Sequence, residues 1–221
     1  MKRVYSVLPI ALLVALAASP VQAQNLSAGP KLGIGFANQG GDVEDTDSKM
    51  GFSIGGSFGI QLHEYFRLQF EGQYVQKGLS EDVGGADADF NLDYIEFMVP
   101  AILTIPTGNG SITPRLYVGP ALALEVSCDF SAEEDGVSAS IDCDELSEAT
   151  DGFLPDLETK SIDFGVLFGG GLDIAVGSGA ITFDVLYNLG LTDINDIPGT
   201  TEEIKNRNIQ IVAGYRFFFG G

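Results

Sequence analysis

Six charged residues stand at positions where their side chains could form ion pairs inside the folded chain. They are Arg67, Glu71, Arg115, Asp173, Asp184 and Arg216. Each lies in a segment in which apolar and polar residues alternate, and each is on the polar side of that alternation. A charge removed from water must be paired or hydrated. We therefore expect an interior network of ion pairs that supports the fold; a proton or ion path is the alternative use of the same charges.

Catalytic chemistry has little support in the sequence. Acyl transfer needs a nucleophile and usually a histidine within hydrogen-bonding reach. The one histidine, His63, lies in the short stretch LHEY between two alternating segments. The glycine runs GIGF, GGSFG and FGGG lie within such segments and do not open helices, so they do not fit a phosphate-binding loop. We expect no catalytic residue, no cofactor and no enzyme activity.

Acidic residues gather in three polar stretches between the alternating segments, at residues 38–49, 78–91 and, most densely, 127–159. Oxygen-rich clusters can hold calcium, but the D-x-D-x-D-G loop with a distal glutamate is missing. We expect a solvated acidic surface, and binding of divalent cations there is the open alternative.

The formal net charge is −20, and it becomes −22 if Lys2 and Arg3 are removed with a leader segment. A chain this acidic would repel the phosphates of nucleic acid, so we expect no nucleic-acid partner.

The chain begins like an exported protein. Lys2 and Arg3 precede a short apolar stretch that ends in small residues at Ala23, which is typical of a secretory signal peptide. We predict that residues 1–23 are a signal peptide and that residues 24–221 form one domain. The two cysteines, Cys128 and Cys143, lie in one polar stretch of this exported chain. An oxidising compartment favours a disulfide between them over a zinc pair, since no histidine is near.

The elements that would position these residues are strands, because alternation with a period of two runs through almost the whole chain. We expect eight strands, over residues 32–36, 51–62, 66–74, 95–105, 116–124, 162–174, 181–189 and 208–221. Each offers one face without charge. Such a face fits lipid, where Arg or Lys at mid-depth costs ~2–4 kcal/mol, and it also fits the inside of a soluble β-sandwich.

Two features favour the membrane. The opposite faces are rich in Gly, Ser, Gln and Asn, which suit the crowded interior of a narrow barrel. The connections also alternate in length: residues 38–49, 78–91, 127–159 and 192–205 are long, whereas residues 62–65, 106–110 and 175–179 are short. Short periplasmic turns and long outer loops are the pattern of outer-membrane barrels. No later stretch offers ~20 apolar residues in a row, which excludes a helical membrane protein.

The last segment fits this interpretation, since its alternate residues are apolar and it could close a barrel against the first strand. Tyr215, Phe217 and Phe219 resemble the C-terminal signal that the barrel-assembly machinery reads. Tyr187 and Phe66, with Tyr215 and Phe217, are candidates for the aromatic girdles at the membrane surfaces.

Six stretches carry a family resemblance when taken in order. They are GPKLGIGF, DYIEFMVPAIL, PRLYVGPALAL, DFGVLFGGGLDI, FDVLYNLGLTDI and the closing GYRF. Together they resemble the PorT-type outer-membrane β-barrel family over nearly the whole mature chain. The resemblance implies that Pro100 and Pro120 are tolerated inside strands. Glu96 departs from it, because it precedes Pro100 by four residues where the family has two.

We therefore expect an all-β, eight-stranded antiparallel up-and-down transmembrane barrel in a bacterial outer membrane, with a filled lumen and no substantial pore. The expected role is non-enzymatic, either structural or in surface interactions. Its expected partners are outer-membrane lipid, lipopolysaccharide and the barrel-assembly machinery, and we expect a monomer. The alternatives are the secretion-accessory role that the PorT resemblance implies, a lipid-modifying enzyme, and a soluble periplasmic β-sandwich.

Overall fold

The computed structural model describes residues 26–41, 47–83, 86–108, 110–134, 137–143, 145, 161–194 and 203–220. The predicted signal peptide, residues 1–23, lies outside these residues and stays a prediction. The described part of the chain forms ten β-strands. They are β1 Leu26–Gly41, β2 Asp47–His63, β3 Phe66–Val83, β4 Ala86–Met98, β5 Ala101–Thr104, β6 Ile112–Glu134, β7 Val137–Asp142, β8 Ile162–Val176, β9 Gly179–Gly190 and β10 Ile204–Phe219.

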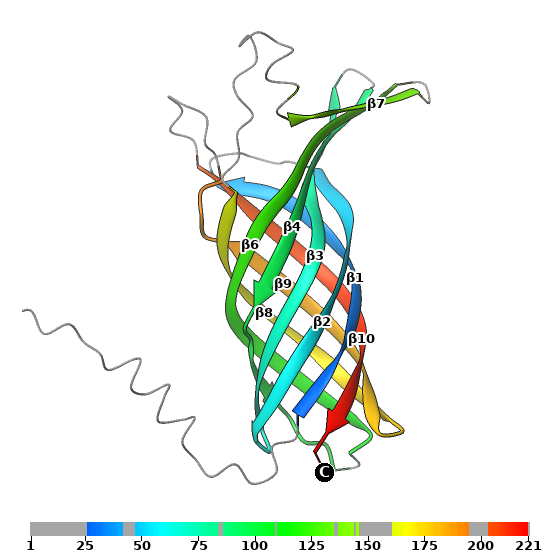
Figure 1. The fold of residues 1–221 in the computed structure, drawn as a ribbon, viewed down its shortest axis with the longest axis vertical. Coiled ribbons are helices and arrows are strands. Elements are labelled where there is room, and N and C mark those ends of the chain that lie inside the picture. The colour runs from blue at the N-terminus through cyan, green and yellow to red at the C-terminus, as the bar shows by residue number, and fades with distance from the viewer. Residues whose placement is uncertain are drawn as a thin grey trace, which may run out of the picture.

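The strands close into a ring with eight positions (Figure 1). Every pairing is antiparallel, and neighbours in sequence are neighbours in space, with β4 and β5 sharing one position between β3 and β6. The ring closes where β10 pairs with β1, from Leu26 opposite Phe219 to Gly41 opposite Ile204. The predicted all-β, antiparallel up-and-down arrangement is confirmed. The soluble β-sandwich alternative fails, because the strands form one closed ring instead of two stacked sheets.

The predicted apolar face of each strand points outward. Leu32, Ile54, Leu116, Phe183 and Ile211 come from five different strands, and each leaves roughly half of its surface exposed. In a water-soluble protein such a continuous exposed apolar surface would be a liability. Its residues alternate with inward-facing ones along every strand, as the pleat requires.

The inward face is mainly polar. Its buried uncharged polar residues are Ser27, Gln39, Ser53, Gln69, Gln73, Thr182, Asn188, Asn206, Asn208 and Gln210. These small or medium side chains and many glycines let the strands surround a narrow interior that side chains fill.

The short connections lie at the end that holds the C-terminus and the start of β1 (Figure 1). They join β2 to β3, β5 to β6 and β8 to β9, as predicted. By the pattern of outer-membrane barrels, this is the periplasmic end.

Two of the long connections differ from expectation. The expected loop over residues 78–91 is a continuation of two strands, which pair from Gly78 opposite Asn91 to Val83 opposite Ala86. The expected loop over residues 127–159 also begins as strand, since β6 runs to Glu134 and β7 pairs back on it. Both extensions project beyond the ring (Figure 1). The sequence does alternate through ADADFNLD at the start of β4 and through VSASID of β7. The apolar residues there are mainly small and the acidic residues are dense, which favours the interpretation of these stretches as loops.

One predicted proline position is also corrected. Pro100 does not lie inside a strand, because the strand is interrupted at residues 99–100, between the end of β4 and the start of β5. Proline has no N–H to donate, and the gap is spanned by hydrogen bonds from Gln69 N to Pro100 O, 3.0 Å, and from Val99 N to Pro120 O, 3.1 Å. Pro120 does lie within a strand, β6, opposite Val166.

Within the described residues, no helix is both long and apolar enough to cross a membrane.

Candidate functional site

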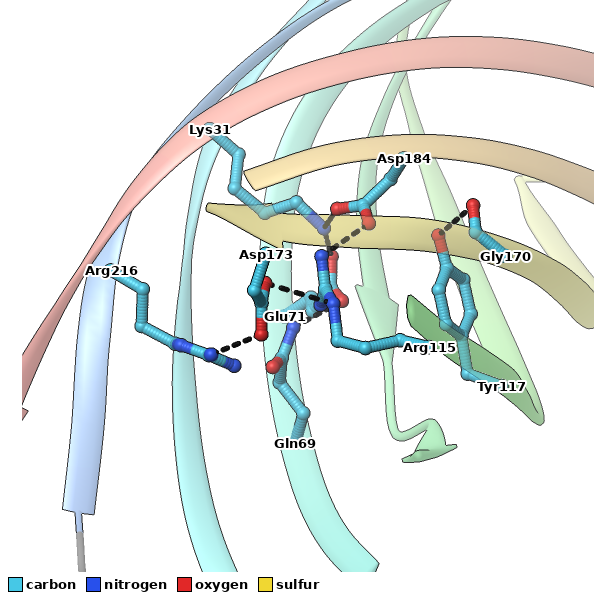
Figure 2. A network of polar contacts seen from close by, with 9 residues as sticks. All are labelled: Lys31, Gln69, Glu71, Arg115, Tyr117, Gly170, Asp173, Asp184 and Arg216. Atoms are coloured by element: carbon cyan, nitrogen blue, oxygen red, sulfur yellow. Dashed lines mark hydrogen bonds and ion pairs between the residues drawn. The ribbon is translucent and has the colours of Figure 1, made fainter. Parts of the chain in front are cut away.

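The interior near the periplasmic end holds a cluster of charged side chains from six strands, β1, β3, β6, β8, β9 and β10 (Figure 2). The Lys31 ammonium lies 2.6 Å from Glu71 and 3.5 Å from Asp184. The Glu71 carboxylate also accepts a hydrogen bond of 2.7 Å from Gln69. These side chains are buried, so their charges can be balanced only by one another or by something bound beside them.

Two arginines share the remaining carboxylates of this cluster. The Arg115 Nη2 donates to Asp184 over 2.6 Å, and its Nε lies 2.9 Å from Asp173. The Nε contact is an ion pair without hydrogen-bond alignment, since neither atom has a hydrogen-bond partner. Arg216 pairs with the other oxygen of Asp173. Each of these two arginines therefore contacts Asp173 from a different strand, β6 or β10 (Figure 2).

Arg67 differs from the other predicted members. Its side chain is buried, with 3% of its surface exposed. We expect it to meet a carboxylate, but within the described residues it forms no ion pair, and its Nε and Nη2 have no hydrogen-bond partner. The structure thus pairs four of the six predicted residues with one another, pairs Glu71 with Lys31, which was not among the six, and leaves Arg67 beside them without an ion pair.

A second polar cluster centres on Glu96, which has no exposed surface. Its carboxylate accepts hydrogen bonds from Lys77 at 2.9 Å, Gln73 at 2.7 Å and Asn188 at 2.5 Å. The Lys77 ammonium also lies 4.9 Å from the centre of the Tyr94 ring. This cluster lies farther from the short turns than the first one. Strands β3 and β9 both start at a short turn; Gln73 comes after Glu71 on β3, and Asn188 comes after Asp184 on β9.

Asp163 adds a polar contact at the same level, because it accepts a hydrogen bond of 3.0 Å from Asn206. The sequence predicts the inward direction of Glu96 and Asp163 from strand parity but not their partners. Lys77 lies outside the predicted strand over residues 66–74. It has the same parity as Arg67 and Glu71, so extending that strand would include it.

An apolar layer lies between the two polar clusters on β4, β5, β6, β8, β9 and β10, whereas on β3 the clusters adjoin, because Glu71 and Gln73 are successive inward positions. Its buried residues are Met98, Ile102, Tyr117, Ala121, Leu167, Leu186 and Val212. Strand β9 shows the order most simply: Asp184 belongs to the first cluster, Leu186 to the apolar layer and Asn188 to the second cluster. Successive inward positions on one strand therefore supply the layers, as a period of two requires.

A cavity of about 560 Å³ lies at the periplasmic mouth, below the first cluster. Its lining includes Gln61 near the end of β2, Glu64 in the turn that follows, and Arg67, Asp173 and Arg216 of the first cluster. The charged cluster is thus accessible from the periplasmic side, while the apolar layer lies on its other side.

The remaining predicted residues lie at the two ends of the barrel. Tyr215 donates its hydroxyl to Val176 O over 3.1 Å and packs edge-on against Phe217, with ring centres 4.6 Å apart. Phe217 and Phe219 point outward and are about half exposed. At the other end, Cys128 and Cys143 form a disulfide that ties β6 to the residue after β7.

Two features relevant to catalysis have ordinary structural settings. The pattern Gly-x-Ser-x-Gly occurs around Ser53 and Ser57, but both serines lie within β2, away from any strand-to-helix turn. His63 is exposed at the end of β2, where its Nδ1 accepts a hydrogen bond of 3.4 Å from Tyr65 N. Among the described residues, no three His, Cys, Asp or Glu side chains group closely enough to hold a metal ion.

The closed ring and the outward apolar surface are the features of an outer-membrane barrel, and a comparison of the sequence with known families agrees. The model of the outer membrane protein beta-barrel domain family matches residues 9–217. The chain belongs to this family. Among curated proteins, no significant match to the sequence was found.

Solved outer-membrane proteins have a similar fold. OprG from Pseudomonas aeruginosa has a TM-score of 0.56 and 11% identity, over 90% of this chain and 98% of that one. AlkL, solved in DMPC lipid bilayers, has a TM-score of 0.50 and 12% identity, over 100% of this chain and 98% of that one. The family and these folds place the protein in the bacterial outer membrane.

Proposed function

We propose that this outer-membrane barrel is not an enzyme and serves a structural or surface-interaction role through its acidic extracellular end. The observation that carries the proposal is the β6–β7 hairpin, which extends beyond the ring and is tied by the Cys128–Cys143 disulfide. A covalently tied extension suits contact with other molecules better than a freely moving loop, because less conformational entropy is lost on binding. The filled interior supports the same proposal, since buried apolar side chains occupy much of the lumen of the barrel and a transport role would need an open one.

The end of the barrel that carries the hairpin is acidic, which favours cations as its ligands. Asp129 is half-buried there, and Asp142 and Glu145 are exposed. The neighbouring surface of an outer membrane is lipopolysaccharide, whose phosphates would be repelled by these carboxylates unless divalent cations bridge the two. We therefore propose lipopolysaccharide as the surface partner, with Mg²⁺ or Ca²⁺ as the bridge, and a monomeric barrel that the assembly machinery inserts by its C-terminal strand.

Binding of lipopolysaccharide to the protein in nanodiscs tests this role. We expect the wild type to retain labelled lipopolysaccharide when Mg²⁺ is present and to lose it when EDTA is added. The triple variant Asp129→Asn, Asp142→Asn, Glu145→Gln should retain several-fold less. Glu64→Gln removes an exposed charge at the periplasmic end and is the matched control. Equal retention by the triple variant and the wild type would reject the role of the hairpin.

The resemblance to the PorT-type family supports one alternative function, an accessory role in protein secretion. A strain without the gene would then fail to export a set of proteins that the complemented strain exports. If the surface role is correct, the exported proteins are the same in both strains.

The lipid-modifying alternative has a test of its own. Mass spectra of lipid A from the two strains should be identical under our proposal, because neither His63 nor the two serines of β2 have the setting of a catalytic residue. A lipid A species that depends on the gene would show that the protein takes part in lipid modification.

A further inference from the structure

The Arg67 guanidinium is a buried cation that forms no ion pair with a described residue, although the carboxylates of Asp173, Asp184 and Glu71 lie near enough to act on its charge. Its side chain projects inward from β3, with 3% of the residue exposed. Its Nε and Nη2 are buried and have no hydrogen-bond partner. Removing one charge from water without compensation is among the most costly events in a folded protein, so a bound anion would relieve a large penalty.

The neighbouring carboxylates are already engaged. Glu71 contacts Lys31, Asp184 contacts both Lys31 and Arg115, and Asp173 contacts Arg115 and Arg216. Within this cluster the buried cations Lys31, Arg67, Arg115 and Arg216 face the buried carboxylates Glu71, Asp173 and Asp184. The cluster therefore has one positive charge in excess, and Arg67 is the member that lacks a partner.

The unpartnered donors share one cavity, the cavity of about 560 Å³ at the periplasmic mouth. Arg67, Arg216 and Thr104 all line it. The Nε and Nη1 of Arg216 and the Oγ1 of Thr104 are buried without hydrogen-bond partners, like the two nitrogens of Arg67. Two guanidinium groups and a hydroxyl thus have unsatisfied donors beside a space that is large enough for a small solute.

We propose that this cavity binds a small oxyanion, a phosphate or a carboxylate, that enters from the periplasm. Oxyanions match the planar fork of a guanidinium, because two oxygens can accept two parallel N–H bonds. Glu64 and Asp173 also line the cavity, but Asp173 is already paired with Arg115 and Arg216. The proposal concerns the periplasmic mouth and so goes beyond the role proposed for the extracellular end.

Calorimetric titration of the folded protein in nanodiscs tests it. Inorganic phosphate, glycerol phosphate and acetate are titrated separately at constant ionic strength, with chloride as the background anion. We expect saturable binding of phosphate. Arg67→Met should weaken it at least tenfold, about the effect of losing a charged hydrogen-bonding partner. Arg67→Lys keeps the positive charge but loses the planar guanidinium, so its affinity for phosphate should lie between those of the wild type and Arg67→Met. Arg207→Met, which changes an exposed arginine of β10, is the matched control and should bind like the wild type.

Thr104→Val provides a second variant that keeps every charge, so the test does not depend on Arg67→Met alone. It should fold and bind phosphate more weakly than the wild type. Glycerol phosphate that binds as tightly as inorganic phosphate would identify lipid headgroups as the source of the ligand, and weaker binding would identify the free anion. A wild type that binds none of the three anions, or an Arg67→Met variant that binds them equally well, would overturn the proposal.

Discussion

Glu96 shows how a single buried residue organises the interior. It has no exposed surface, and Lys77, Gln73 and Asn188 all donate to its carboxylate. The membrane surrounding the barrel offers no water to replace these partners from outside. Loss of its negative charge would therefore leave the Lys77 ammonium buried without compensation.

We predict that Glu96→Gln lowers the free energy of unfolding by ~3–5 kcal/mol, the usual cost of breaking a buried ion pair. Urea titration of the protein folded in lipid vesicles measures it. Glu203→Gln is the control, because Glu203 pairs with Lys205 at an exposed site, 2.5 Å apart, and should change stability by no more than ~1 kcal/mol.

The double variant Lys77→Met, Glu96→Leu should regain much of the loss, since well-packed apolar residues often replace a buried ion pair without cost. Equal stability of Glu96→Gln and the wild type would contradict the importance that we assign to this cluster.

The sequence predicts the inward direction of charged residues better than their partners. Parity along one strand is a local property, so the alternation alone identifies Arg115, Asp173, Asp184 and Arg216 as inward-facing. Which of these side chains meet depends on the register of each strand relative to its neighbours around the ring, and that register has no signature in the sequence of a single strand. For this reason the sequence does not predict the isolation of Arg67.

At the scale of the strand, glycines permit close approach where the regular ladder is interrupted. The break at Pro100 lies against Gly119 of β6. A Cβ added at Gly119 would lie 2.6 Å from Pro100 Cα and closer still to Val99 O, which are backbone atoms that cannot rotate away. The break and the glycine opposite it therefore form one local structure.

Gly119→Ala should lower stability by at least ~1–3 kcal/mol, the usual cost of overpacking, or prevent assembly. The gel shift between unheated and boiled samples measures the folded fraction. Gly72→Ala is the control, because a Cβ there would lie in ordinary contact, 3.8 Å from the Phe97 ring. If both variants fold like the wild type, the close approach at Gly119 has been overestimated.

The β6–β7 hairpin is the element that sequence analysis missed. Its strands do alternate, as CDFSAE in β6 and VSASID in β7, but with few large apolar residues in a long acidic stretch, so residues 127–159 resemble a loop. Pairing with β4 and between the two arms makes part of this stretch regular. The two cysteines are a further local signal that this stretch has a defined structure.

Reduction of the Cys128–Cys143 disulfide should loosen the hairpin but leave the barrel folded. The crosslink closes a loop of about 15 residues, for which the chain-entropy model gives ~3 kcal/mol. Cys128→Ser with Cys143→Ser should therefore be cut faster by external protease at the hairpin. Its boiling-dependent gel shift should match that of the wild type. Loss of that shift would mean that the disulfide stabilises the whole barrel.

At the scale of the whole molecule, one arrangement explains both surfaces. A closed ring satisfies the backbone of every spanning strand, and alternation then sends apolar residues outward and polar residues inward. The sequence predicts this arrangement because each strand and the alternation of connection lengths indicate it independently.

The filled interior predicts that the protein forms no substantial pore. In planar bilayers the purified protein should give no stable conductance steps, because the apolar layer and the paired side chains of the two polar clusters together fill the interior. Regular open steps of porin size would contradict a closed lumen.

The central claim is that hydrocarbon surrounds the outward face of the ring, and tryptophan quenching tests it directly. The chain contains no tryptophan, so a single introduced one reports without background. Phe183 faces outward and Phe218 lines the periplasmic cavity, and both are about half exposed. Brominated lipid should quench Phe183→Trp, whereas aqueous iodide should quench Phe218→Trp. Quenching of Phe183→Trp by iodide and not by brominated lipid would contradict the account.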